Sequence, residues 1–246
     1  MSITFATNCW ENDWEYLLKK GYLERMISNC NYPFKEKILC IGNVSKLSEV
    51  IKYASKKIEE GVIDNYLVTD NSATEVLKFF SIDKDSFGTG FSYSIAPLSA
   101  IYYCQTELLL YFTGDAYIEK DGNLWLKQAS GLLMDSDDFF VANPLWNNNY
   151  EEAKNESFRE TSDSFVGYGF SDQCFLVRSA DFKKPMYNEY NIASERYPKY
   201  AGELFEKRVD SYMRNHNLYR VTSKTTSYIH QNYPLAKKSF FKRIFK

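Results

Sequence analysis

Three apolar segments, each followed by a longer segment with helical spacing, open the chain. The apolar segments span residues 3–10, 37–44 and 64–71, and the helical patterns that follow them span residues 13–29, 45–61 and 72–82. Parallel strands need a crossover connection, usually a helix, so repeated strand-helix units predict a parallel sheet. We therefore expect an α/β fold, with a mostly parallel sheet and helices on both of its faces.

The fourth unit of this kind ends on an acid. Residues 94–106 have helical spacing with Pro97 in the first turn, and the apolar strand 108–118 that follows reaches Asp115. An acid at this point is compatible with a turn, with a helix cap, or with a site that holds a metal and a phosphate. In open α/β sheets the ligand sits outside the carboxyl ends of the strands, where we expect Asp115 to lie.

The second half of the chain has a different pattern. Its segments predict helices over residues 124–138 and 201–217 and strands over residues 173–182 and 218–230. A polar, Asn-rich loop is predicted over residues 139–157. There is no internal repeat and no low-complexity linker, so we expect a single domain with a divergent C-terminal half. The division into parts would be residues 1–118, residues 119–232 and a basic tail, residues 233–246.

Composition excludes several classes of protein. The net charge is −2, from 30 basic and 32 acidic side chains, so the chain is not a general nucleic-acid binder. Its five cysteines are scattered and form no Cys/His cluster, which predicts reduced cytosolic thiols and argues against a structural zinc site. No apolar run approaches the roughly 20 residues that span a bilayer. No P-loop and no Gly-x-Gly-x-x-Gly follow the first strand, which disfavours ATPases and classical dehydrogenases.

The segment FSYSIAPLSAIYYCQTELLLYFTGDAYI, residues 91–118, resembles the helix and strand that lead into the Asp-x-Asp motif of nucleotide-sugar glycosyltransferases with the Rossmann-like GT-A fold. The motif reads Thr113-Gly114-Asp115 here, so its first acid is missing. The resemblance implies that Asp115 binds a divalent metal, Mn²⁺ or Mg²⁺, which neutralises the charge that develops on the diphosphate leaving group. Thr113 and Gly114 would contact the donor, and Thr113 leaves the metal dependence open.

A second stretch, residues 203–230, resembles the family's helix that begins with an acidic pair and the strand that follows it and ends on His. The resemblance implies that Glu206 is the general base of an inverting transfer, with Glu203 as the alternative. It also implies that His230 is a metal or diphosphate ligand. By residue type alone, Glu206 equally suits a solvated helix face and His230 a surface position.

The nucleotide-sugar donor would bind where the first three strands end. The resemblance places the base and the ribose at Ala6, Thr7 and Asn8, at Gly42 and Asn43, and at Asp70. Any doubly wound fold carries polar residues at such strand ends, so these positions have low specificity.

On the acceptor side, Trp146 and Tyr168 could stack on a sugar face, and Asp172 could bind an acceptor hydroxyl or act as an unorthodox base. Core packing explains either aromatic ring equally well.

These features together predict a glycosyltransferase that moves a sugar from a nucleotide-sugar donor to a glycan or lipid-linked acceptor, in bacterial surface polysaccharide synthesis. A nucleotidyltransferase, or a degenerate sugar-nucleotide-binding or scaffold protein, is the alternative. Residues 237–246 carry five basic side chains and no acid, and as a helix they would place apolar residues on one face. That pattern predicts attachment to an anionic membrane surface, so we expect a cytoplasmic protein, peripheral on the inner face of the membrane.

Overall fold

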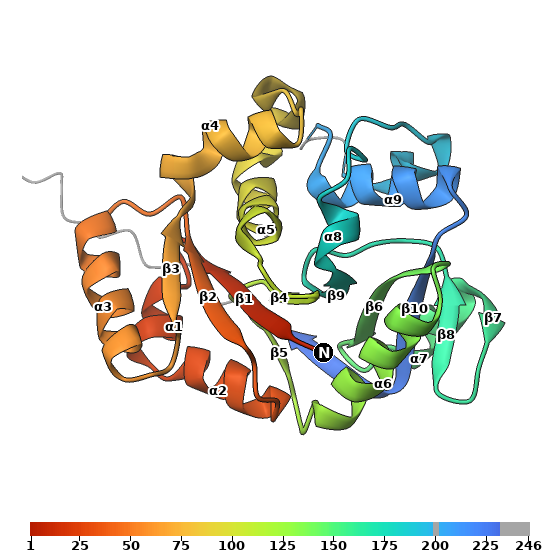
Figure 1. Ribbon diagram of the computed structural model, residues 1–246, viewed down its shortest axis with the longest axis horizontal. Coiled ribbons are helices and arrows are strands. Elements are labelled where there is room, and N and C mark those ends of the chain that lie inside the picture. The colour runs from red at the N-terminus through yellow and green to blue at the C-terminus, as the bar shows by residue number, and fades with distance from the viewer. Residues whose placement is uncertain (199–201, 232–246) are drawn as a thin grey trace, which may run out of the picture.

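One continuous sheet runs through the computed structural model, which describes residues 1–198 and 202–231 (Figure 1). The strand order is β3-β2-β1-β4-β9-β6-β10-β8-β7, with β5 paired to β10. The strands are β1 (Ile3–Cys9), β2 (Glu36–Ile41), β3 (Asn65–Val68), β4 (Leu108–Phe112), β5 (Ala116–Ile118), β6 (Phe139–Trp146), β7 (Ser157–Glu160), β8 (Ser164–Gly167), β9 (Cys174–Arg178) and β10 (Tyr219–His230). The predicted basic tail, residues 237–246, lies outside the described residues.

The sheet is mixed, with most strands running in one direction. β1, β2, β3 and β4 pair in parallel, as do β6 and β10, whereas β5, β8 and β9 run the other way. The predicted α/β fold, with a mostly parallel sheet, helices on both faces and a divergent C-terminal half, is confirmed. No break in the sheet separates the two halves, because β5 of the first half pairs with β10 of the second.

Each face of the sheet is covered by its own set of helices. On one side α1 (Trp14–Lys19), α2 (Tyr22–Cys30), α3 (Leu47–Glu59) and α6 (Asn123–Asp135) enclose an apolar core. On the other side α4 (Thr69–Phe79), α5 (Phe91–Tyr103), α8 (Ser179–Phe182) and α9 (Phe205–Asn215) enclose a second core. β4 serves both cores, since Leu108 and Leu110 point into the first and Leu109 and Tyr111 into the second. The described residues also form the helix α7 (Tyr150–Asn155) and the 3₁₀ helices η1 (Lys84–Gly90) and η2 (Ile192–Arg196).

Some predicted boundaries are wrong. Residues 13–29 form two helices because Gly21, at φ 75°, breaks the pattern. Pro97 is not in the first turn of its helix, because α5 begins six residues earlier, at Phe91.

The segment 139–157 is also not the predicted polar loop, because it contains the strand β6 and the helix α7. The sequence of β6 does not indicate a strand because it contains Pro144, which cannot donate a hydrogen bond to a neighbouring strand. The sheet accommodates this proline where the register between β6 and β10 shifts, between Thr222 and Ser227.

No helix in residues 1–198 and 202–231 is long and apolar enough to cross a membrane.

The central position of β4 gives a stability prediction. Leu110 is fully buried, so we expect Leu110→Ala to lower the free energy of unfolding by about 2–5 kcal/mol. Leu124→Ala is the control, because Leu124 on α6 is 64% exposed and should change stability by less than ~0.5 kcal/mol. Denaturant unfolding monitored by circular dichroism measures both, and equal effects for the two variants would contradict this account of the core.

Candidate active site

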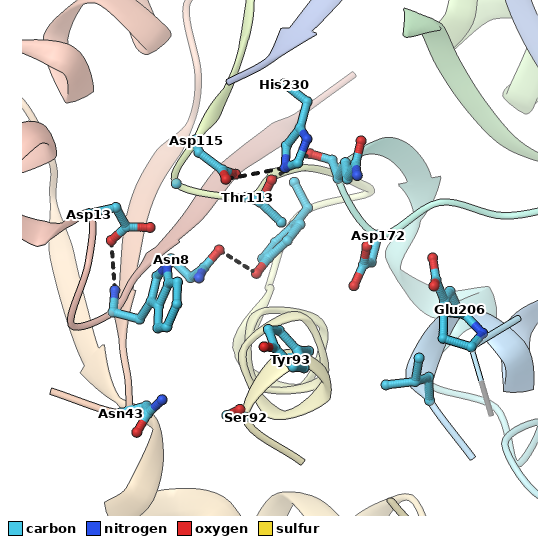
Figure 2. A pocket seen from close by; sticks show the side chains of 16 residues that line it. Asn8, Asp13, Asn43, Ser92, Tyr93, Thr113, Asp115, Asp172, Glu206 and His230 are labelled. Carbon is cyan, nitrogen blue, oxygen red and sulfur yellow. Dashed lines mark hydrogen bonds and ion pairs between the residues drawn. The ribbon is translucent and has the colours of Figure 1, made fainter. Parts of the chain in front are cut away.

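A cavity of about 470 Å³ opens at the carboxyl ends of β1, β2 and β4. Figure 2 shows its side chains converging from the sheet, from the first turn of α5 and from α9. The lining residues are Asn8, Trp10, Asp13, Asn43, Ser92, Tyr93, Tyr111, Thr113, Gly114, Asp115, Asp172, Gln173, Pro198, Leu204, Glu206 and His230. The site therefore lies where the ligand of an open α/β sheet is expected.

Asp115 belongs to the turn that joins β4 to β5. The backbone N–H of Ala116 donates to the Thr113 carbonyl, and the N–H of Thr113 donates to the carbonyl of Gln173, both at 3.0 Å. The Asp115 carboxylate lies 3.2 Å from Nε2 of His230, at the end of β10 (Figure 2). The hydrogen bond to Asp115 raises the pKa of His230, against the lowering effect of burial. The fold thus brings two residues 115 positions apart in the sequence into one ion pair.

Gly114 is required by a close approach of two chain segments. A Cβ atom at this position would lie 2.4 Å from the carbonyl oxygen of Asn8 and 2.7 Å from Oδ2 of Asp13. Any side chain would therefore push the turn away from β1.

Asp13 is a site residue that sequence reasoning missed. Its side chain is 2% exposed, and Oδ1 accepts a hydrogen bond of 2.8 Å from the N–H of Trp10. Burial, followed by the nearby charge of Asp115, raises the pKa of Asp13 well above its ordinary value. Asp13 precedes α1, so its signal in the sequence is that of an ordinary helix N-cap.

Asp172 and Glu206 form a second acidic pair in the same cavity (Figure 2). Asp172 lies just before β9, and Glu206 is in the first turn of α9. Burial raises the pKa of Asp172 to about 6, and the charge of His230 opposes this shift. Burial and the charge of Asp172 raise the pKa of Glu206 to about 9. Near neutral pH the pair therefore shares one proton and carries one negative charge.

Four of the six residues predicted for the nucleoside line a cavity. Asn8 lines the main cavity, where its Oδ1 accepts a 3.0 Å hydrogen bond from the Tyr111 hydroxyl. Gly42, Asn43 and Asp70 line an adjoining cavity of about 130 Å³, which shares Asn8, Trp10, Asn43 and Ser92 with the main one.

Two further residues predicted for the nucleoside lie elsewhere. Ala6 and Thr7 are fully buried inside β1 and line neither cavity.

Three other predicted residues also lie away from the cavity. Glu203 binds Nζ of Lys207 at 2.7 Å. Trp146 packs against the guanidinium of Arg220, and Tyr168 donates a hydrogen bond to Asn217. None of these side chains is among the residues that line the cavity, so the structure does not place either ring to stack on a ligand within it.

The ionisable side chains of the cavity wall are mostly acidic. Four carboxyl groups and one imidazole line it, and no Lys or Arg does so in the described part of the chain. The described residues also hold no group of three or more His, Cys, Asp or Glu side chains that could bind a metal ion alone. An anionic ligand would therefore need a cation to accompany it.

Comparison with known proteins gives similarity at the level of structure only. No protein-family model matches the chain, and no curated protein matches its sequence. Glucosyl-3-phosphoglycerate synthase from Mycobacterium tuberculosis, in complex with Mg²⁺ and uridine diphosphate, is similar with a TM-score of 0.50 and 10% identity. The similarity covers 95% of this chain and 72% of that one.

S. aureus TarS is similar with a TM-score of 0.50 and 14% identity. The similarity covers 94% of this chain and 37% of that one. This chain shares the GT-A fold of these two structures.

The raised pKa of Asp13 gives a pH-dependent stability prediction. The folded protein holds the Asp13 proton more tightly than the unfolded chain, so the wild type loses stability as pH rises from about 4 through the raised pKa. Asn in place of Asp keeps an oxygen acceptor for the Trp10 amide and removes the charge. We expect Asp13→Asn to exceed the wild type in Tm by about 2–4 °C at pH 7.5 and to match it at pH 4.

The matched control for Asp13→Asn is Asp83→Asn. The Asp83 carboxylate also accepts a backbone hydrogen bond, from Asp85 at 3.1 Å, but it lies outside the cavity. The control should show no gain in Tm at pH 7.5. Differential scanning calorimetry from pH 4 to 8 makes the comparison, and a pH-independent effect of Asp13→Asn would contradict the assignment.

Proposed function

We propose that this protein is a glycosyltransferase that moves a sugar from a nucleotide-sugar donor to an acceptor hydroxyl. The observation that carries the proposal is one cavity, at the carboxyl ends of the parallel strands, that combines the Asp115–His230 ion pair with the Asp172–Glu206 acid pair. The first pair is suited to the leaving group and the second to the attacking hydroxyl. The GT-A fold agrees with this use of the site.

The donor would span both cavities. Its base and ribose would occupy the smaller one, near Gly42, Asn43 and Asp70, and its diphosphate would lie at the turn Thr113-Gly114-Asp115. The acidic wall supports a divalent cation, Mn²⁺ or Mg²⁺, which would bind with the diphosphate. Asp115 and His230 would hold it, with phosphate oxygens and water completing its shell. When bound, such an ion supplies charge neutralisation for the departing diphosphate.

The acid pair would serve as the general base. A base must be ionised before it takes a proton, and near neutral pH the pair carries one negative charge. The acceptor oxygen would attack the anomeric carbon while its proton passes to Asp172, and the bond between that carbon and the diphosphate would break. Glu206 would hold the second proton beside it. Attack from the side opposite the leaving group gives inversion, which we propose as the stereochemical outcome.

The acceptor would be a glycan or a lipid-linked saccharide in the synthesis of a bacterial surface polysaccharide. The composition of residues 237–246 supports a place at an anionic membrane surface. A degenerate protein that binds a sugar nucleotide without turnover is the second candidate, because Thr113 replaces the first acid of the motif.

Donor binding is the first test of the transferase. In a thermal-shift panel of UDP-, GDP-, CMP- and dTDP-sugars with and without Mn²⁺, one nucleotide should raise the Tm of the wild type in a metal-dependent way. Asp115→Ala should abolish that shift, while Asp135→Ala, at the exposed end of α6, should retain it. Slow release of nucleoside diphosphate would accompany binding. Binding without any turnover would favour the degenerate protein, and no binding of any donor would contradict both candidates.

The acid pair is tested by amide substitution. Asp172→Asn should lower kcat by about 10²–10⁴-fold with the donor KM little changed, because the ionised base is lost. Glu206→Gln removes only the second ionisation of the pair, near 9, so the acidic limb of the pH profile of kcat should keep its position near pH 6. Glu203→Gln, which changes a carboxylate paired with Lys207 outside the cavity, is the control. Full activity in Asp172→Asn would overturn this assignment of the base.

A further inference from the structure

Arg208 is a buried cation on the back of the helix that carries Glu206. It lies two positions after Glu206 in α9 and is 4% exposed. Residues two apart on a helix do not share a face, so Glu206 reaches the cavity while Arg208 points to the opposite side.

The Arg208 guanidinium joins three separate segments through neutral oxygen atoms. Its Nε donates to the carbonyl of Glu203 at 2.8 Å, Nη1 to the carbonyl of Tyr187 at 2.5 Å, and Nη2 to the hydroxyl of Ser86 at 2.5 Å. The group also packs on the ring of Phe87, 5.0 Å from its centroid. None of the ion pairs in the described part of the chain includes Arg208. Burial of this cation lowers the pKa of Arg208, and the charges of Glu203 and Asp83 offset the desolvation only in part.

Further contacts join the start of α9 to η1 and to α5. Gly202, at φ 66°, lies so close to η1 that a Cβ there would be 2.6 Å from the carbonyl oxygen of Ser86. The N–H of Glu203 donates to that same carbonyl at 2.9 Å. Ser94 of α5 accepts a 3.1 Å hydrogen bond from the N–H of Phe205 and so caps the start of α9.

These contacts around the start of α9 connect the two sides of the cavity. The first turn of α5, next to Ser94, supplies Ser92 and Tyr93 to the wall, and the first turn of α9 supplies Glu206. We propose that Arg208, together with the Ser94 cap, is a positioning residue that fixes the carboxyl group of Glu206 against Asp172 in the cavity. The inference rests on the proposed function for its catalytic meaning, whereas the position of Glu206 can be measured without any substrate.

Several groups act directly on the carboxyl group of Glu206. Asp172 and Asp210 face it with negative charge and Arg196 with positive charge, and the backbone N–H of Asp172 donates to its carboxylate. These partners come from the segment before β9, from α9 itself and from η2. A shift of α9 by a fraction of a turn would change the distances from Glu206 to Asp172 and Arg196, so the titration of Glu206 reports its position.

The experiment titrates Glu206 directly in the full chain. Protein with ¹³C-labelled glutamate carboxyls is followed by NMR across pH, and Glu206→Gln assigns the Glu206 signal. In Arg208→Lys we expect the apparent pKa of Glu206 to fall by at least ~1 unit, and in the milder Ser94→Ala by about half as much. The same variants should lower kcat about tenfold with the donor KM within about twofold of the wild type.

Arg178→Lys is the matched control. Arg178 also donates to backbone carbonyls, those of Leu133 and Ser136, but it lies at the far end of β9 from the cavity. Its substitution should lower Tm and leave the Glu206 titration unchanged. If Glu206 titrates as in the wild type in both Arg208→Lys and Ser94→Ala, the positioning role is wrong. A wild type that releases no nucleoside diphosphate would overturn the proposed function alone, since the titration decides the positioning role independently.

Discussion

The parallel pairing of β4 with β1 is the constraint on which the rest of the structure depends. It brings the ends of both strands to one edge of the sheet, where the main chain at Gly114 meets the carbonyl of Asn8. The approach is so close that only glycine fits at position 114, between the carbonyl oxygen of Asn8 and the carboxylate of Asp13. The next residue, Asp115, is thereby held at the rim of the cavity and within reach of His230.

The same geometry concentrates acidic side chains in a partly buried space. Asp13, Asp115, Asp172 and Glu206 line one cavity, and burial raises the pKa of three of them, Asp13, Asp172 and Glu206. Such a cluster lowers the stability of the folded protein, because like charges repel and burial disfavours ionisation. Binding of a cation and a polyanionic donor in this cavity would account for this loss of stability. The rigid attachment of α9 through Arg208 then keeps the acids in place while no ligand is bound.

Sequence reasoning succeeded where local pattern and global fold agree. The strand-helix alternation of the first half is regular, and the predicted sheet and the position of Asp115 at a strand end are both found. It failed at β6, where Pro144 and the asparagines that follow the strand resemble a loop, because the neighbouring strands β9 and β10 supply the pairing that stabilises this segment. It also missed Asp13, whose neighbours Gly114 and Asp115 lie in the turn after β4, about 100 residues further along the chain.

The sequence by itself determined the class of fold and the chemical types available at the strand ends, because hydrophobic periodicity and strand termini are local properties of the chain. Only the tertiary structure decided which of those side chains meet. It brought Asp172 to Glu206 and His230 to Asp115, and it left Trp146 outside the cavity. The reason is physical: strand order and helix attachment are set by long-range packing, so the distances between residues far apart in sequence do not follow from any local pattern.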